Sequence, residues 1–269
     1  MSIFRCLLHP LPLPTPLFFP RQKALNLSFP CLWISPKQSH AFSLERRTLS
    51  TSSSTNVSTD FAPNLTELDD VLKGYMFGQK KATEVAHLIW KLVVQKGDTV
   101  VDATCGNGND TLALAKLVVD DVAKGCVYGM DIQDDAIQNT SSLLDQSLDR
   151  NQRKYVKLFS ICHSRMVEVL PKNISVRLVA FNLGYLPGGD KGLITNSATT
   201  LLALKAAKEL LLPGGIISVV AYVGHPGGRE EYEIVRSFAA ELPADKWVCS
   251  HIQMLNKPLA PVLVFLFKR

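Results

Sequence analysis

Residues 100–111 read Val100-Val101-Asp102-Ala103-Thr104-Cys105-Gly106-Asn107-Gly108-Asn109-Asp110-Thr111, and the rest of the chain is best interpreted outward from them. Two β-branched residues lead into a loop with glycines at alternate positions, and an amphipathic run follows, which predicts a strand, a tight turn and a helix start. Glycine has no Cβ to keep a ligand away, and the amides at a helix N-terminus attract partial negative charge. The pattern therefore predicts a nucleotide-type cofactor site, although ordinary strand-to-helix turns share it.

Helical and strand patterns alternate from residue 80 onward. Strands are predicted at 99–103, 126–131, 156–162, 176–182, 216–223, 247–255 and 262–267, and helices at 80–94, 111–119, 136–148, 197–212 and 230–242. This alternation predicts an α/β, Rossmann-like fold, with a seven-stranded, mostly parallel sheet and helices on both faces. Too few residues join the last two strands for a helical crossover, so they are expected to form an antiparallel pair at one edge.

The first 59 residues differ from the rest in composition. They hold six of the 29 Lys and Arg, one of the 24 acids, and many Ser, Pro, Leu and Phe, which is typical of an organellar transit peptide. We therefore expect a disordered leader over 1–59 and a single domain over 60–269. Prolines interrupt the apolar run at 7–19 and disfavour a membrane anchor. The lack of a clear Arg-rich amphipathic helix favours the chloroplast over the mitochondrion.

Charges balance in residues 60–269, with 23 basic and 23 acidic side chains. Because this domain lacks a global positive field, any RNA contact must use a local patch. One group of cations is expected near the ligand cleft: Lys80, Lys81, Lys191 and Arg229. A second group precedes the third strand and is expected to form a solvated face at the opposite edge: Arg150, Arg153, Lys154 and Lys157. The six cysteines have no metal or disulfide spacing, which predicts reduced thiols.

Ligands in such folds bind at the carboxyl ends of the parallel strands, so the residues just after each strand are candidates. Asp131 follows the second strand and can accept two hydrogen bonds from a ribose diol, with a helix N-cap as the less favoured alternative. His163 follows the third strand, where it would border an adenine or the tail of the cofactor, while a lone His is more often structural. Both residues indicate a nucleoside ligand.

The residues after the fourth strand form the most distinctive segment, Phe181-Asn182-Leu183-Gly184-Tyr185-Leu186-Pro187-Gly188-Gly189-Asp190-Lys191. Three glycines, a proline and several polar groups predict a shaped loop. The Asn182 amide, together with a backbone carbonyl, can accept hydrogen bonds from an amine and aim its lone pair at an electrophile. The alternative is an Asn that caps the loop. Residues 222–229 form a second glycine-rich wall of the same cleft.

These motifs resemble the class I S-adenosylmethionine-dependent methyltransferases. Residues 70–269 are similar to the MnmM family, formerly labelled rRNA methylases, and the segment from Asn182 to Lys191 is the most specific part of the resemblance. The resemblance implies an enzyme that converts 5-aminomethyl-(2-thio)uridine at tRNA wobble position 34 to its 5-methylaminomethyl form, with S-adenosylmethionine as cofactor and no metal. It implies the tRNA anticodon stem-loop as partner, no membrane, and leaves a homodimer open.

The resemblance also implies roles for individual residues. The implied cofactor-binding residues are Asp102, Thr104, Gly106, Asn107, Gly108, Asn109, Asp110, Asp131, Gln133 and His163. The implied catalytic residues are Asn182 and Tyr185, which would receive the amine, and Asp190, which shares with His225 the candidacy for proton acceptor. The implied substrate-binding residues are Gly188, Gly189, Lys191, His225 and Arg229.

Three other functions share the glycine loop. The first is an rRNA methyltransferase. The second is a small-molecule methyltransferase of plant secondary metabolism, which usually carries extra helical segments over its substrate. The third is a noncatalytic S-adenosylmethionine-binding partner of an RNA-processing complex, which need not keep a competent loop around Asn182.

Overall fold

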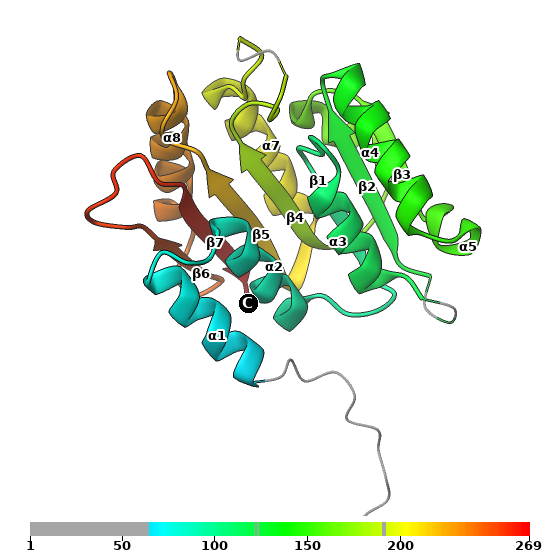
Figure 1. The fold of residues 1–269 in the computed structure, drawn as a ribbon, viewed down its shortest axis with the longest axis horizontal. Coiled ribbons are helices and arrows are strands. Elements are labelled where there is room, and N and C mark those ends of the chain that lie inside the picture. The colour runs from blue at the N-terminus through cyan, green and yellow to red at the C-terminus, as the bar shows by residue number, and fades with distance from the viewer. Residues whose placement is uncertain (1–64, 121, 123, 190–191) are drawn as a thin grey trace, which may run out of the picture. The chain divides into compact units, whose positions relative to one another are not determined.

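The computed structural model describes residues 65–269 apart from 121, 123, 190 and 191, and a seven-stranded sheet forms its centre (Figure 1). Its strands are β1 Thr99–Asp102, β2 Cys126–Asp131, β3 Val156–Ser160, β4 Val176–Leu183, β5 Leu211–Ala221, β6 Trp247–Ile252 and β7 Val262–Lys268. The strand order is β3-β2-β1-β4-β5-β7-β6, with β1 to β5 parallel and β7 antiparallel to both neighbours. The predicted fold class, including the antiparallel edge pair, is confirmed.

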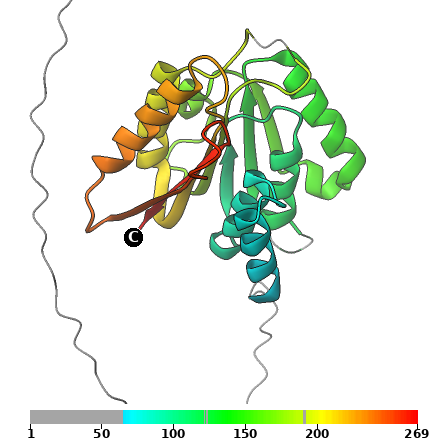
Figure 2. The same cartoon turned by 60° about the vertical axis from the view of Figure 1, so that its left-hand side comes forward.

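Helices cover both faces of the sheet. They are α1 Leu65–Met76, α2 Ala82–Val93, α3 Asn109–Val118, α4 Asp134–Ser147, α5 Arg150–Arg153, the 3-10 turn η1 His163–Arg165, α6 Met166–Val169, α7 Ser197–Leu210 and α8 Gly228–Ala240. Figure 2 shows α7 and α8, in yellow and orange, on one side of the sheet and α2, α3 and α4 on the other. None of the described helices is long and apolar enough to cross a membrane.

Alternation along the strands creates the two cores. Val100 and Leu178 face α2, α3 and α4, whereas their neighbours Val101 and Val179 face α6, α7 and α8. Successive side chains of a strand point to opposite faces, so a strand covered by helices on both sides must be apolar throughout. This requirement explains the apolar residues 100–101 of β1 and 178–181 of β4. Because β1 to β5 are parallel, the polar residues at their carboxyl ends lie along one side of the sheet.

Several element boundaries differ from the sequence predictions. Helix α1 was not predicted, although Val71, Leu72 and Tyr75 give it an apolar side that packs in the core. Helix α7 ends two residues earlier than predicted, because β5 begins at Leu211 and carries Pro213-Gly214-Gly215 through a register shift against β4. The predicted transit peptide and its boundary at residue 59 lie outside the described residues.

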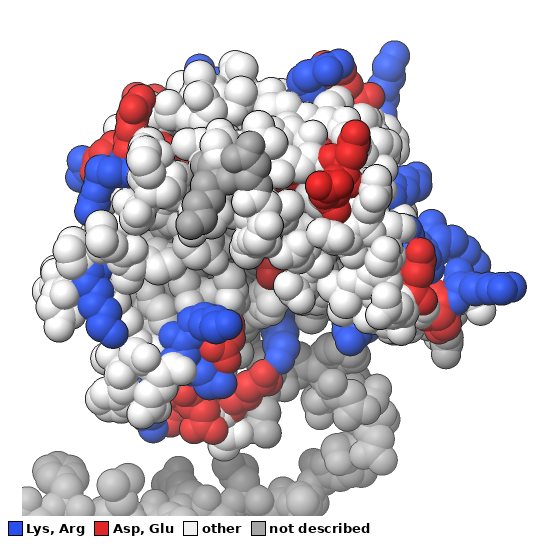
Figure 3. All heavy atoms as spheres, turned by 45° about the horizontal axis from the view of Figure 1, so that its top comes forward, with Lys and Arg blue, Asp and Glu red and all other residues white. Residues whose placement is uncertain are grey.

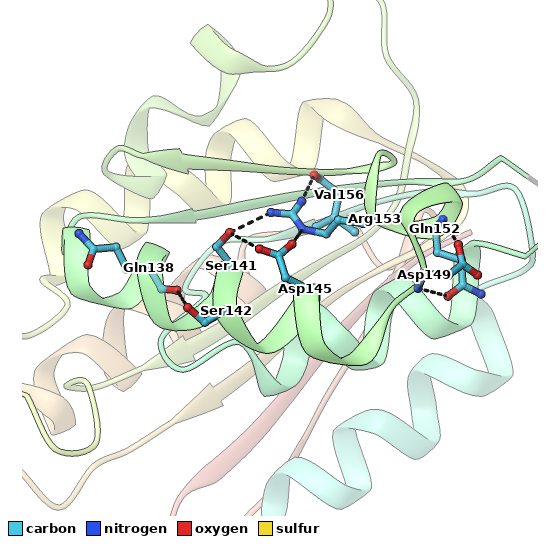
Figure 4. A network of polar contacts seen from close by, with 8 residues as sticks. All are labelled: Gln138, Ser141, Ser142, Asp145, Asp149, Gln152, Arg153 and Val156. Carbon is cyan, nitrogen blue, oxygen red and sulfur yellow. Dashed lines mark hydrogen bonds and ion pairs between the residues drawn. The ribbon is translucent and has the colours of Figure 1, made fainter.

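The basic cluster before β3 lies at the amino end of that strand, as predicted, and part of it is engaged in structure (Figure 4). Arg153 donates hydrogen bonds to the Asp145 carboxylate at 2.7 Å and to the Val156 carbonyl at 2.9 Å. Asp149 caps α5 by accepting from the amide of Asn151 at 2.7 Å. Because parallel strands share one direction, this cluster is far from the edge where the strands end.

Candidate active site

The loop between β1 and α3 owes its shape to two glycines. Gly106 and Gly108 have φ values of 52° and 84°, a region that other residues rarely adopt. Gly108 is the N-cap of α3, and a Cβ at this position would lie 2.8 Å from the backbone Cα of Thr140 in α4. The Thr140 hydroxyl also donates to the Gly106 carbonyl at 3.1 Å. The loop is therefore held against α4, and it presents backbone at the N-terminus of α3.

Asp102 lies beneath this loop at the end of β1, and its side chain is only 1% exposed. It accepts hydrogen bonds from the Thr111 hydroxyl at 2.6 Å and the Thr104 amide at 3.2 Å. Burial, followed by the negative charges of Asp110 and Asp131, raises the pKa of Asp102 from 3.8 to about 7. Three carboxyl groups thus gather beneath and beside the glycine loop, an arrangement that suits a positively charged ligand.

Asp102→Asn tests this electrostatic environment. A carboxyl whose pKa is raised by folding favours the folded state fully below its unfolded pKa, and that contribution is lost as pH rises through about 7. We therefore expect the Tm of the native protein to fall by on the order of 5 °C more than that of the variant between about pH 5 and pH 8. Thermal unfolding across this range measures the difference, with the exposed Asp245→Asn as control. Equal slopes for native protein and Asp102→Asn would contradict the shift.

Asp131 joins the end of β2 to the glycine loop. Its two carboxylate oxygens accept from the amides of Gly106 and Gln133, each at 3.0 Å. The N-cap of α4 is Gln133, whose side chain makes no capping hydrogen bond. Asp131 is therefore not the helix cap that the sequence allowed as an alternative. Both residues are half-buried at the carboxyl edge of the sheet. A ribose diol is expected at this place, and the role of Asp131 in binding it stays a prediction.

Asn182 lies near the end of β4, beside β1. Its backbone amide donates to the Thr104 hydroxyl at 2.7 Å, and its side-chain Nδ2 donates to Oδ2 of Asp110. The other carboxylate oxygen of Asp110 is 2.6 Å from Nε2 of His87, on α2. The Asn182 Oδ1 atom is buried and has no hydrogen-bond partner among the described residues. Because an unpaired buried acceptor is costly, this oxygen marks a place for a donor from a ligand.

The loop after β4 is closed at its base. Tyr185 and Ile194 form an isolated antiparallel bridge, and the Thr195 amide donates to the Gly184 carbonyl at 2.9 Å. The ring of Tyr185 meets that of His225 edge-on at 6.0 Å. The predicted wall formed by residues 222–229 therefore lies against this loop.

A buried carboxyl group anchors the same loop to the helices. Glu231, 2% exposed at the start of α8, accepts from the hydroxyls of Thr195 at 2.6 Å and Thr200 at 2.5 Å. Burial raises the pKa of Glu231. On the opposite side, Asn107 of the glycine loop donates to the Pro187 carbonyl at 3.2 Å. These contacts bring the two predicted loops together into one site.

Other predicted residues occupy different environments. His163 is 6% exposed, its ring packs edge-on against Phe181 at 5.9 Å, and burial lowers its pKa to about 4. A neutral, buried ring at this place supports the loop, and a cofactor contact stays a prediction. Asn109 is exposed in the first turn of α3. Gly188 has open space around it, and Gly189 lies close to the Leu186 side chain. Asp190 and Lys191 lie outside the described residues.

Sequence reasoning missed His87 and Glu231. Both are helical residues that reach the site from α2 and α8, whereas the strand-end pattern points only to residues that follow strands. The available signal was a polar side chain one turn before a buried apolar one, since Trp90 follows His87 and Val235 follows Glu231 at this spacing and both are buried. Two surface hollows of about 440 and 620 Å³, one between α8 and the β6–β7 pair and one between α7 and α8, contain none of the predicted site residues.

Similarity to known proteins covers most of the described chain. The family model described as "Putative rRNA methylase" matches residues 127–268. A chloroplastic tRNA (mnm(5)s(2)U34)-methyltransferase of Arabidopsis thaliana is 63% identical over 205 residues, which is 75% of this chain and 74% of that protein.

Two solved structures extend the similarity to the fold. A protein of Clostridium thermocellum described as a putative rRNA-methylase is 42% identical with a TM-score of 0.65, over 71% of this chain and 98% of that one. A Streptococcus mutans protein described as a putative methyltransferase, in complex with SAH, is 33% identical with a TM-score of 0.61, over 71% of this chain and 99% of that one.

Proposed function

This chain belongs to the family described as "Putative rRNA methylase", and from that membership we propose that it is a chloroplast tRNA methyltransferase. It uses S-adenosylmethionine to N-methylate 5-aminomethyl-(2-thio)uridine at wobble position 34. The observation that carries the proposal is the buried, unpartnered Oδ1 of Asn182 beside the glycine loop. An acceptor in that place suits an amine, which has N–H groups to donate.

The site fits the cofactor on two further observations. The glycine loop exposes backbone at the N-terminus of α3, where a Cβ at Gly108 would collide with α4. Asp102 and Asp131 place their carboxyl groups beneath and beside the loop, where they complement positive charge. When bound, S-adenosylmethionine supplies a methyl group activated by a positively charged sulfur. The half-buried Asp131 is the residue that would hold the ribose diol.

Orientation is the main contribution of the chain to the reaction. Oδ1 of Asn182 accepts one N–H of the neutral amine, which leaves the nitrogen lone pair free to attack the methyl carbon. The chain would have no large new charge to stabilise, because the cofactor would bring one positive charge and the methylated amine would carry one. The nitrogen then loses a proton, and His225, whose ring lies 6.0 Å from that of Tyr185, is a candidate acceptor with Asp190.

The anticodon stem-loop is proposed to dock across the carboxyl edge of the sheet. Figure 3 brings this edge forward and shows Lys and Arg interspersed with Asp and Glu around it, so contacts to phosphate depend on individual cations. Arg229, the last residue of the wall formed by 222–229, is exposed at the start of α8 and donates to the Pro258 carbonyl at 3.2 Å. Lys80 is less available, because it forms an ion pair with Glu84 at 2.8 Å.

Arg229→Glu is expected to weaken tRNA binding by about tenfold at low salt and to reduce the slope of log K against log salt by roughly one to two. The reason is that reversal removes one phosphate contact and adds a repulsive charge. Filter binding or fluorescence anisotropy at several salt concentrations measures both quantities. Lys154→Glu, at the amino end of β3, is the matched control and should bind like the native protein. Equal affinity of Arg229→Glu and native protein at every salt concentration would refute this docking surface.

Nucleoside analysis tests the function itself. Purified protein is incubated with S-adenosylmethionine and chloroplast tRNA that carries the aminomethyl nucleoside, and the digested tRNA is examined by mass spectrometry. We expect the 5-methylaminomethyl form to appear in the tRNA and an rRNA fragment in the same assay to stay unmethylated. Plants that lack the protein should accumulate the aminomethyl nucleoside in chloroplast tRNA. Methylation of rRNA alone would support the rRNA alternative and overturn the proposal.

A further inference from the structure

A chain of three polar side chains connects α2, α3 and β4 behind the proposed amine site. His87 Nε2 lies 2.6 Å from Oδ1 of Asp110, and Oδ2 of Asp110 accepts from Nδ2 of Asn182. Asp110 is 7% exposed, so its carboxyl group is largely shielded from water. Each of the two carboxylate oxygens of Asp110 therefore has a protein partner.

We propose that Asp110 and His87 are positioning residues that fix the orientation of the Asn182 amide, an inference that rests on the proposed function and deepens it. The cofactor contact that the resemblance implies for Asp110 stays a prediction, and among the described residues its two carboxylate oxygens contact His87 and Asn182. The geometry assigns its carboxylate to the residue that receives the substrate amine.

The argument begins with the donors and acceptors. A carboxylate only accepts hydrogen bonds, so the atom of the Asn182 amide that faces Asp110 must be the donor Nδ2. A flip of the amide would set its carbonyl oxygen against the carboxylate, two acceptors in contact. The orientation that avoids this conflict directs Oδ1 away from Asp110, and that atom is the buried one without a partner. Asp110 therefore selects the amide orientation that offers an acceptor to an amine.

His87 completes the arrangement, because the same rule requires its Nε2 to carry the proton that Asp110 accepts. The imidazole is held by its own helix, with its ring centroid 4.6 Å from that of Trp90. The backbone of Asn182 is fixed independently through its amide bond to Thr104. The side-chain amide is thus the part of Asn182 whose orientation depends on the Asp110–His87 pair.

Four variants separate this role from a cofactor contact: Asp110→Asn, His87→Leu, His87→Gln and the control His251→Leu on β6. Asp110→Asn can donate to Asn182 as well as accept, so the amide loses its preferred orientation, and kcat should fall by about 100-fold. His87→Leu removes the donor and should lower kcat by about tenfold. His87→Gln can place an amide N–H near the position of Nε2 and should recover most of that loss. The Kd for S-adenosylhomocysteine and the KM for tRNA should change by less than about threefold in all four.

A second readout needs no turnover. The side-chain amide protons of Asn182, observed by NMR, should exchange with solvent about tenfold faster in His87→Leu and Asp110→Asn than in the native protein and His87→Gln. Native protein without methylation of aminomethyl tRNA would count against the proposed function, while the exchange measurement would still test the inference. Equal exchange in all variants, equal kcat for His87→Leu and His87→Gln, or a loss of S-adenosylhomocysteine affinity that parallels kcat would overturn it.

Discussion

Asn182→Ala is expected to lower kcat by about 10²–10³-fold while the Kd for S-adenosylhomocysteine changes by less than about threefold. The variant loses the buried Oδ1 that has no partner among the described residues, and hence the acceptor for the amine. It keeps the glycine loop and the Asp131 carboxylate, which are the expected contacts of the cofactor. An interaction made with the reacting nitrogen affects turnover, whereas cofactor binding uses other groups.

Single-turnover methylation of aminomethyl tRNA and calorimetric titration of S-adenosylhomocysteine measure the two quantities. The matched control is Asn196→Ala, which removes an Asn side chain with a purely structural role, because Asn196 is the N-cap of α7 and accepts from the Ala198 amide at 2.9 Å. The Asn196→Ala substitution should lower the free energy of unfolding by about 1 kcal/mol and leave kcat near that of the native protein. Native-like turnover in Asn182→Ala would show that Asn182 does not receive the amine. Equal losses in kcat and in affinity for S-adenosylhomocysteine would show that Asn182 binds the cofactor instead.

The sequence predicts the order and type of the elements better than their ends. The bounds of β2 were predicted correctly at both ends, because Gly125 precedes an apolar run that closes on Asp131. Helix α3 was predicted to start at Thr111, whereas it begins at Asn109, directly after Gly108 in a left-handed conformation. A glycine that caps a helix by its φ angle leaves no side-chain signal, so the sequence could not locate that start. The register shift of β5 at Pro213-Gly214-Gly215 depends on pairing with β4, so the local sequence likewise gives no signal for it.

Site residues at strand ends were predicted from the sequence, whereas His87 and Glu231 on helices were not. Asp102, Asp131 and Asn182 were predicted at one edge of the sheet because parallel strands end together, and the structure places all three there. Which of them faces a ligand depends on how tightly α3 and α4 pack over the loop, and that packing buries Asp102 to 1% exposure. His87 comes from a helix outside the strand-end pattern, so its contact with Asp110 needed the three-dimensional structure.

Gly108→Ala should separate the conformational and steric requirements of the glycine loop. The added Cβ would meet the Thr140 Cα of α4 at 2.8 Å, and a backbone atom cannot rotate away as a flexible side chain can. The φ value of 84° adds a conformational cost of about 1–2 kcal/mol for any residue with a Cβ. We expect the Tm to fall by roughly 5–10 °C and the Kd for S-adenosylhomocysteine to rise more than about tenfold, because α3 and its exposed amides must shift.

Gly188→Ala is the matched control for this prediction. Gly188 has a φ value of 87°, close to that of Gly108, but nothing lies within 4 Å of a Cβ added there. The control therefore carries the conformational cost alone, and its Tm should fall by less than half as much, with the affinity for S-adenosylhomocysteine unchanged. Differential scanning fluorimetry and calorimetry provide both numbers. If the two variants lost equal stability and affinity, the close approach of α4 would not be what requires glycine at position 108, and backbone conformation alone would account for it.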